Sequence, residues 1–135
     1  MSYPISKLDG IDGETAKALK SAGIRTSAKL LEAAKDTKGR KALAEKTGFN
    51  EKLLLKWANA ADRLRIKGLG REFSELMLEA GVKTVRDLKH RNAARLARAM
   101  ADANRKRRRV KVPPSEKSVT RWVEQAKKLP LKISY

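Results

Sequence analysis

The sequence predicts an all-α fold made of two repeated helical units, with no significant sheet. Apolar residues recur at helical spacing, as Leu54, Trp57 and Ala61 do. Aromatic residues make up only 4% of the chain while 41% of it is apolar, so the core must be aliphatic and alanine-rich, which favours helices over strands. The chain also matches itself at an offset of 58 residues.

Each copy of the repeat has an apolar-x-Gly-apolar turn, a helix-favouring stretch and an Ala-Gly-apolar-basic-Thr segment. The matched residues are Leu8, Gly10, Ile11, Leu19, Ala22, Gly23, Ile24, Arg25, Thr26 and Leu30 in one copy, and Ile66, Gly68, Leu69, Met77, Ala80, Gly81, Val82, Lys83, Thr84 and Leu88 in the other. A helix containing Trp57 then matches one containing Trp122, after a register shift of seven. We therefore expect two units, residues 1–64 and residues 65–135, with a basic loop at residues 105–114.

Capping residues set the expected helix boundaries. Polar residues that suit helix starts are Thr26, Asn50, Thr84, Asn92 and Ser115, and glycines that suit helix ends are Gly23, Gly48 and Gly81. The expected helices cover residues 14–22, 27–34, 37–46, 51–64, 71–80, 85–89 and 92–103, and a last one follows residue 115. Residues 131–135 alternate as a strand does, but they are too few to form a sheet alone.

The chain is strongly basic. Lys and Arg number 33 against 15 Asp and Glu, a formal net charge of +18. Such a surplus repels itself until a polyanion neutralises it, and nucleic acid is the usual polyanion because each neutralised phosphate releases counterions. Two alternatives are charge that only keeps the protein soluble, and an anionic membrane surface, although no segment resembles an amphipathic anchor. Residues 65–135 hold 20 basic and 7 acidic residues, so the second unit is the better candidate for the polyanion surface.

Targeting signals are not evident. The sequence has no cysteine, which excludes disulfides. The N-terminal residues do not form a charged start followed by an apolar run, so no signal peptide is expected, and no apolar stretch approaches the roughly 20 residues of a membrane span. We expect a soluble, cytoplasmic protein that is associated with the nucleoid if its ligand is DNA.

The second turn, residues 67–71, is the strongest candidate for a binding site. Its residues are Lys67, Gly68, Leu69, Gly70 and Arg71. Glycines permit positive φ and close approach of the backbone, and the helix that follows offers unpaired N–H groups at its positive end. The sequence therefore predicts a site for one phosphate, with the side chain of Leu69 turned inward.

The residues around this turn resemble a known motif. Residues 66–70, followed by Phe73, Leu76 and residues 80–82, are similar to the helix-hairpin-helix motif of DNA repair and recombination proteins. From residue 3 to residue 135 the chain also resembles DUF4332, a bacterial family of tandem helix-hairpin-helix proteins. The resemblance implies an all-helical fold and a turn that holds a DNA phosphate through backbone amides without recognising base sequence.

The first turn, residues 9–13, departs from this pattern because Asp12 stands where the second glycine is expected. An aspartate there can cap the next helix, but its charge repels a phosphate over the turn, and Gly13 only partly restores access to the backbone. We therefore interpret the first turn as mainly structural, with Gly10 and Gly13 as weaker candidates for phosphate binding.

A run of basic residues follows the second turn in the sequence. It contains Arg105, Lys106, Arg107, Arg108, Arg109 and Lys111. Like charges so close together disfavour helix packing, so we expect a loop or a frayed helix end, with Pro113 and Pro114 forcing an extended exit. It is interpreted as a flexible arm along phosphates, and an ordinary solvated loop is the alternative.

Other residues are weaker candidates. Arg91, Arg95 and Arg98 have the spacing of one helical face and extend the basic surface, unless that face is merely solvated. Trp57 and Trp122 lie in apolar helix faces, so we expect them in the core. His90 has no cluster of carboxylates or cysteines around it, and no metal site or cofactor is expected.

The sequence bears on three classes of function: an enzyme, a nucleic-acid-binding protein and a scaffold for other proteins. The chain lacks the Gly-Pro-Asp extension of the helix-hairpin-helix glycosylases, and no lysine stands out as a nucleophile, so we expect no enzyme activity and no small-molecule substrate. Duplex DNA is the preferred ligand, and structured RNA is also open. A scaffold that docks on acidic proteins is the rival, distinguished by a shallower dependence of affinity on salt. The oligomeric state is not predicted.

Overall fold

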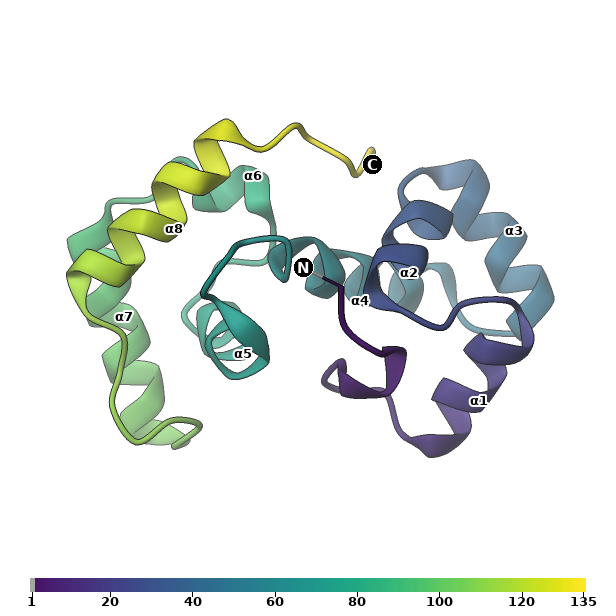
Figure 1. Ribbon diagram of the computed structural model, residues 1–135, viewed down its shortest axis with the longest axis horizontal. Helices are drawn as coiled ribbons and strands as arrows, with labels where there is room; N and C mark the ends of the chain where they lie inside the picture. Colours follow the sequence, from purple (N-terminus) through teal and green to yellow (C-terminus); the bar gives the residue numbers. More distant parts are fainter. Residues whose placement is uncertain (1) are drawn as a thin grey trace. The chain divides into compact units, whose positions relative to one another are not determined.

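The computed structural model describes residues 2–135, and within that range the regular elements are helices, with no strand (Figure 1). Its elements are η1 (Ile5–Lys7), α1 (Gly13–Ser21), α2 (Ser27–Ala34), α3 (Thr37–Thr47), α4 (Glu51–Arg63), α5 (Gly70–Glu79), α6 (Val85–Leu88), α7 (Ala93–Lys106) and α8 (Glu116–Lys128). The all-α prediction is confirmed. No helix among these residues is both long enough and apolar enough to span a bilayer.

The chain divides into two units. Unit 1 comprises Met1–Arg65 together with Lys132–Tyr135, and unit 2 comprises Ile66–Leu131. The sequence placed the boundary after residue 64 and assigned every later residue to the second copy. The packing instead puts Lys132–Tyr135 with unit 1, where they lie in extended coil and not in a strand.

The helices begin at the predicted caps. The side chains of Thr26, Asn50, Thr84, Asn92 and Ser115 each accept a hydrogen bond from a backbone N–H in the first turn of the helix that follows. Gly48 ends α3 in the left-handed conformation, with φ of 78°. Most boundaries lie within one residue of those expected, and the largest difference is at the end of α7, which continues past Ala103 to Lys106. Asp102 pairs there with Arg105, and basic side chains are favourable at a helix C-terminus.

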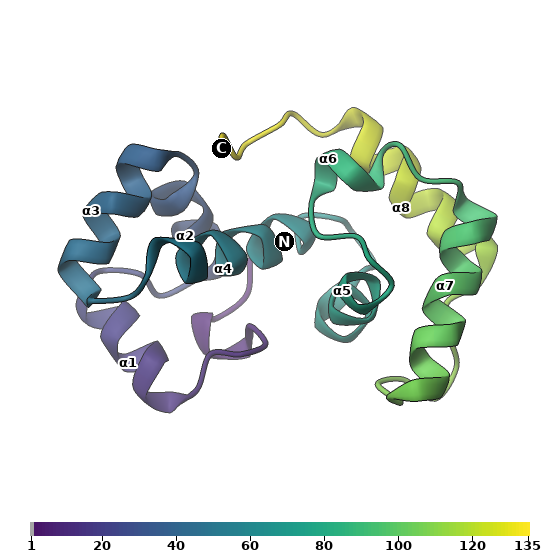
Figure 2. The same cartoon turned by 180° about the vertical axis from the view of Figure 1, so that it is seen from behind.

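The core of unit 1 lies between α2 and α4, which run side by side (Figures 1 and 2). Leu30 and Leu54 are fully buried there. Trp57 is 4% exposed, and the ring of Phe49 meets its indole edge-on at 5.2 Å between centroids. Trp57 thus belongs to the core, as predicted, and Phe49 packs against it.

The core of unit 2 is built around the pair α7 and α8, with α5 packed against α7 (Figure 2). Leu76, Met100 and Val119 are fully buried. Trp122 is 4% exposed, and its ring centroid lies 5.4 Å from that of Phe73. Most of the buried hydrophobic side chains of the two units are aliphatic, in line with the composition.

Packing around α3 gives a test of this fold. Replacing Gly39 with alanine should lower the free energy of unfolding by about 1–3 kcal/mol, the usual cost of overpacking, because a Cβ at Gly39 would overlap the backbone carbonyl of Ala33. Helix propensity alone predicts a gain of up to about 1 kcal/mol. Gly13→Ala is the matched control, since a Cβ there meets nothing within 4 Å. Urea unfolding followed by circular dichroism measures both, and a stabilised Gly39→Ala protein would contradict this packing.

Candidate functional site

The second turn has the backbone that its glycines predict. Gly68 and Gly70 lie at φ of 82° and 68°, in the region that favours glycine. Leu69 between them is 1% exposed, and its N–H donates to the carbonyl of Ile66 at 3.3 Å. The apolar side chain therefore anchors the turn in the core, while the flanking Lys67 and Arg71 are exposed.

The first turn matches the second up to Ile11 and then differs, because Asp12 lies at φ of −81° where Gly70 has φ of 68°. Gly10 lies at φ of 81°, Ile11 is 7% exposed, and the Ile11 N–H donates to the carbonyl of Leu8 at 3.3 Å. A tryptophan lies behind each turn: Trp57 Nε1 is 3.9 Å from the position of a Cβ on Gly10, and Trp122 Nε1 is 3.8 Å from that on Gly68. The indole thus occupies the inner side of each turn.

The two turns differ at the helix that follows. The carboxylate of Asp12 caps α1 by accepting the N–H of Thr15 at 2.8 Å, and hydrogen bonds from the backbone and then the side chain of Thr15 hold the pKa of Asp12 below its ordinary value. Gly13 is the first residue of α1, directly after this cap. In contrast, the N-cap residue of α5 is Leu69, and no side chain caps that helix. The side chain of Leu69 cannot accept a hydrogen bond, so the N-cap position of α5 has no counterpart of the Asp12 cap.

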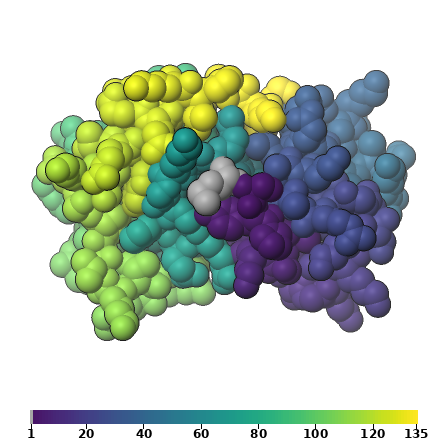
Figure 3. Space-filling model, viewed as in Figure 1, coloured from purple at the N-terminus to yellow at the C-terminus, as the bar shows by residue number. Residues whose placement is uncertain are grey.

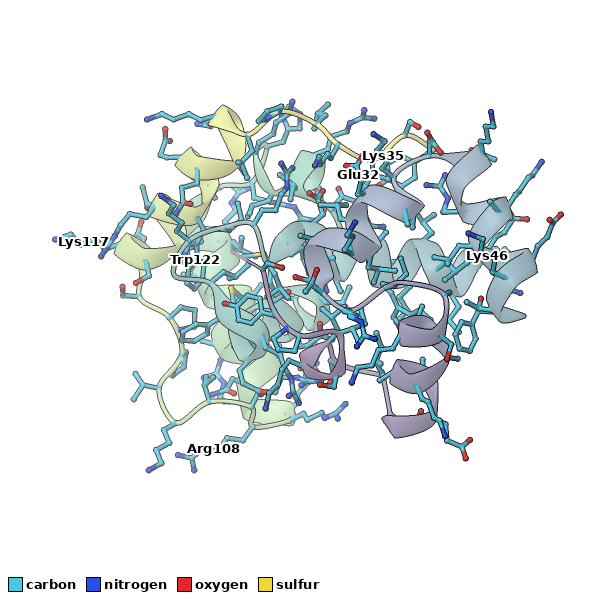
Figure 4. The ribbon with its side chains drawn as sticks, turned by 45° about the vertical axis from the view of Figure 1, so that its right-hand side comes forward. Glu32, Lys35, Lys46, Arg108, Lys117 and Trp122 are labelled. Carbon is cyan, nitrogen blue, oxygen red and sulfur yellow. The ribbon has the colours of Figure 1, made fainter. Side chains whose placement is uncertain are left out.

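A pocket of about 150 Å³ opens beside the second turn. Its lining residues are Lys67, Gly68, Phe73, Ser118, Arg121, Trp122 and Gln125. The Gln125 side chain clamps the turn: its Oε1 accepts the Lys67 N–H at 2.9 Å, and its Nε2 donates to the Lys67 carbonyl at 3.0 Å. Figure 4 shows Trp122 inside unit 2, whereas Lys117, one turn before Arg121 on α8, projects outward.

Arg121 and Gln125 were missed from the sequence. A signal for Arg121 was present, since Arg121 precedes Trp122 as Lys56 precedes Trp57 in the repeat. Nothing in the sequence indicated Gln125, because its partner Lys67 is 58 residues away. Arg71, a predicted site residue, lies 3.6 Å from the carboxylate of Glu72.

Asn104 makes hydrogen bonds to the basic loop, which an arm that is free along its whole length would not have. Asn104, 7% exposed, accepts the N–H groups of Arg109 at 2.9 Å and Val110 at 3.2 Å, and donates to the Val110 carbonyl at 3.0 Å. Pro114 is buried as well. These hydrogen bonds hold the loop against Asn104, and acidic residues pair with part of its charge.

Acidic residues on α5 and α7 take up part of the charge in the loop. The guanidinium of Arg109, 11% exposed, lies 2.9 Å from the Glu79 carboxylate and 4.0 Å from that of Glu72. Arg107 lies 3.6 Å from Glu79, and Arg105 pairs with Asp102, but both remain about three-quarters exposed. The exposed basic residues of this segment are Arg105, Lys106, Arg107, Arg108 and Lys111. Arg108 projects outward from the loop in Figure 4.

The predicted helical face with Arg91, Arg95 and Arg98 does not form as expected. Arg91 precedes the N-cap of α7, so it is not on that helix, and its guanidinium bonds to both carboxylate oxygens of Asp87, at 3.0 and 2.9 Å. Arg95 and Arg98 are exposed on α7. Arg91 and Arg95 nevertheless meet at one pocket of about 410 Å³, together with His90. Within residues 2–135 no group of His, Cys, Asp and Glu is arranged to hold a metal ion.

Comparison with known proteins gives one match. The family model described as "Domain of unknown function (DUF4332)" matches residues 9–129. No curated protein and no solved structure matches the chain.

The clamp at Asn104 gives a test of the order in the loop. Asn104→Ala should lower the free energy of unfolding by about 1–3 kcal/mol, the cost of leaving buried groups unpaired, and should speed hydrogen exchange at the amides of Arg109 and Val110. Asn104→Asp keeps the Oδ1 acceptor and removes the Nδ2 donor, so these amides should stay protected. Hydrogen exchange measured by NMR checks both variants, and unchanged exchange in Asn104→Ala would show that the loop does not depend on this side chain.

Proposed function

Because the chain belongs to the DUF4332 family, which has no assigned function, we propose a function from the site itself: a non-enzymatic, nucleic-acid-binding protein of two helix-hairpin-helix units. Its preferred ligand is duplex DNA, held without base-sequence preference by the backbone amides of the second turn and by the basic side chains around it. It needs no cofactor. In a bacterial cell, a protein of this kind belongs on the nucleoid.

The main support for this proposal is the difference between the two turns at the N-cap of the helix that follows. In the first turn, the Asp12 carboxylate supplies an anion to the N-terminus of α1 from within the chain. In the second turn Gly68 has the same positive φ as Gly10, but Gly70, at φ of 68°, stands where Asp12, at φ of −81°, stands in the first turn, and the N-cap residue Leu69 makes no side-chain cap on α5. A phosphate is an anion of suitable charge for such a helix N-terminus, where N–H groups and the helix dipole both favour it.

The charge around the second turn supports a polyanion more than a single small anion. Lys67 and Arg121 line the pocket beside the turn, and Lys117 extends the same face of α8. Surface charges are screened beyond about 8–10 Å at physiological salt. A ligand that benefits from all of these cations must therefore present several phosphates in a row.

The ordered basic loop supports binding at low entropic cost. Five exposed basic side chains extend from a backbone that Asn104 and the Arg109–Glu79 pair already hold in place. Ordering a mobile segment on binding subtracts from the affinity, and a preorganised loop avoids part of that loss. Arg109 itself serves the loop and is not proposed as a phosphate ligand.

Buried aromatic residues favour a duplex over a single strand. Proteins that bind single strands without sequence preference stack bases on exposed aromatic rings. Both tryptophans are 4% exposed, and Phe49 and Phe73 pack against them. The basic surface instead offers cations and amides, which bind the phosphate backbone that a duplex presents. Structured RNA shares that backbone, and an acidic protein partner remains the rival.

Substitutions at the two turns test the phosphate site. Gly70→Asp should weaken duplex binding because a like charge 4 Å from a phosphate costs on the order of 1 kcal/mol even in bulk water, which is about fivefold in affinity. Asp12→Gly should leave affinity unchanged or increase it. Fluorescence anisotropy with a labelled duplex measures both.

Strain at Gly70 requires a matched control, because φ of 68° disfavours any side chain. Gly70→Asn has the shape of Gly70→Asp without its charge, and asparagine tolerates this conformation. We expect Gly70→Asn to bind more tightly than Gly70→Asp, with similar melting temperatures. Equal affinities for the two folded variants would exclude the second turn as the phosphate site and favour a protein partner.

The dependence of affinity on salt tests the basic loop. Replacing Arg105, Arg107 and Arg108 with glutamine should lower the slope of log affinity against log salt by roughly 0.9 for each phosphate that the protein no longer neutralises. The control replaces Lys29, Lys38 and Lys46, three exposed lysines of unit 1, and removes the same charge. Titrations at several salt concentrations with duplex DNA, duplex RNA and single strands give the slopes. A shallow slope for the parent protein would contradict a polyanion ligand, and equal slopes for the two triple variants would exclude the loop.

A further inference from the structure

A short segment from far along the chain completes unit 1. Lys132–Tyr135 belongs to that unit, and Ile133, 7% exposed, joins its hydrophobic core. The space-filling view shows these last residues, in yellow, lying against the blue residues of α2 and α3 (Figure 3). The segment thus covers a surface of unit 1 that includes Glu32, Lys35, Arg40 and Asn59, and this surface is called the groove below.

The groove pairs with the main chain of the segment on both sides of Ser134. The Ser134 N–H donates to the Lys35 carbonyl at 2.8 Å, and the Ser134 carbonyl accepts from Arg40 Nη2 at 2.8 Å. Arg40 is 4% exposed, and its Nη1 donates to the Ala34 carbonyl at 2.8 Å. A buried guanidinium is costly unless its donors are satisfied, so Arg40 depends on the carbonyl that the segment supplies.

Side chains of the groove recognise the flanking positions. The hydroxyl of Tyr135 donates to Asn59 Oδ1 at 2.9 Å, and Lys132 Nζ lies 3.3 Å from the Glu32 carboxylate. Glu32 also pairs with Lys35, whose hydrogen bond and then that of Lys132 hold the pKa of Glu32 below its usual value. Figure 4 shows Glu32 and Lys35 next to each other at this edge of the unit. Each residue of the segment therefore has its own partner.

We propose that this groove is a peptide-recognition site for an extended segment of the order basic, aliphatic, any residue, tyrosine, and that it accepts Lys132–Tyr135 from a second copy of the chain when its own segment leaves. The interactions all lie within four consecutive residues, and an exchanged segment from an identical chain reproduces each of them, which is the condition for domain swapping. Leu131, which precedes the segment, is already 48% exposed. Release of the segment therefore exposes little additional surface at Leu131.

This proposal does not depend on nucleic-acid binding. Its residues lie on α2, α3 and α4, at Lys35 between α2 and α3, and on the segment, and none belongs to the second turn or to the basic loop. The first test uses a fluorescent peptide with the sequence of residues 130–135 and the full-length chain carrying Ile133→Asp, which expels its own segment from the core. Circular dichroism verifies that the variant is folded.

We expect the Ile133→Asp chain to bind the peptide at least tenfold more tightly than the parent does. In the parent the linked segment competes at an effective concentration on the order of millimolar. Adding Asn59→Ala to the Ile133→Asp chain removes the acceptor of the tyrosine hydroxyl. Its affinity for the peptide should fall about fivefold, which corresponds to one hydrogen bond. A peptide with phenylalanine in place of the tyrosine should bind equally well with and without Asn59→Ala. A folded Ile133→Asp chain that does not bind the peptide, or binds it no better than the parent does, would overturn the proposal.

A second test does not require a chain whose own segment has been expelled. The chain lacks cysteine, so one chain with Lys35→Cys and one with Ser134→Cys can be mixed, unfolded, refolded at high concentration and oxidised. Exchange between copies should yield disulfide-linked dimers of the two chains, detected on a non-reducing gel, and Ile133→Asp in the second chain should abolish them. Dimers that persist with Ile133→Asp, or none from the unmodified pair, would contradict exchange of the segment.

Discussion

In each unit the indole of a tryptophan on the last helix packs behind the glycine of the first turn, at Gly10 and Trp57 and again at Gly68 and Trp122. This packing joins the beginning and the end of the unit. It also decides which way the turn faces, because the inner side is filled by the indole and by the buried Leu69 or Ile11. The helix that follows the turn is capped by the Asp12 carboxylate in unit 1, whereas the N-cap residue of α5 in unit 2, Leu69, makes no side-chain cap.

The excess of positive charge has two different roles in unit 2. Some guanidinium groups serve the fold: Arg109 pairs with Glu79 and Arg91 pairs with Asp87, and these arginines hold a loop and a turn in place. Others, such as Arg108 and Arg121, are exposed without a structural task that requires their charge. Because the acidic residues of unit 2 pair with some of its arginines, only the remaining cations are available to the proposed nucleic-acid ligand. The proposed interface follows from this pairing more than from the net charge.

The return of Lys132–Tyr135 to unit 1 has a consequence for folding. The core of unit 1 includes Ile133, and the buried Arg40 takes one of its acceptors from Ser134. Unit 1 therefore cannot complete its packing until the rest of the chain has been made. Pairings of such sequence separation slow folding, because closing a long loop costs entropy before the pairing stabilises the fold. They also hold Lys132–Tyr135 in place on unit 1.

The sequence by itself determined the helices, most of their boundaries, the burial of both tryptophans and the positive φ of Gly68 and Gly70. These features depend on residues within three or four positions, such as Thr26 and the N–H of Lys29, or on the period of apolar residues. Only the tertiary structure decided that Arg109 pairs with Glu79, 30 residues away, that Gln125 clamps Lys67 across 58 residues, and that Arg40 meets Ser134 across 94. A charged or polar side chain carries no local sign of its partner, because that partner is chosen by the packing of whole helices.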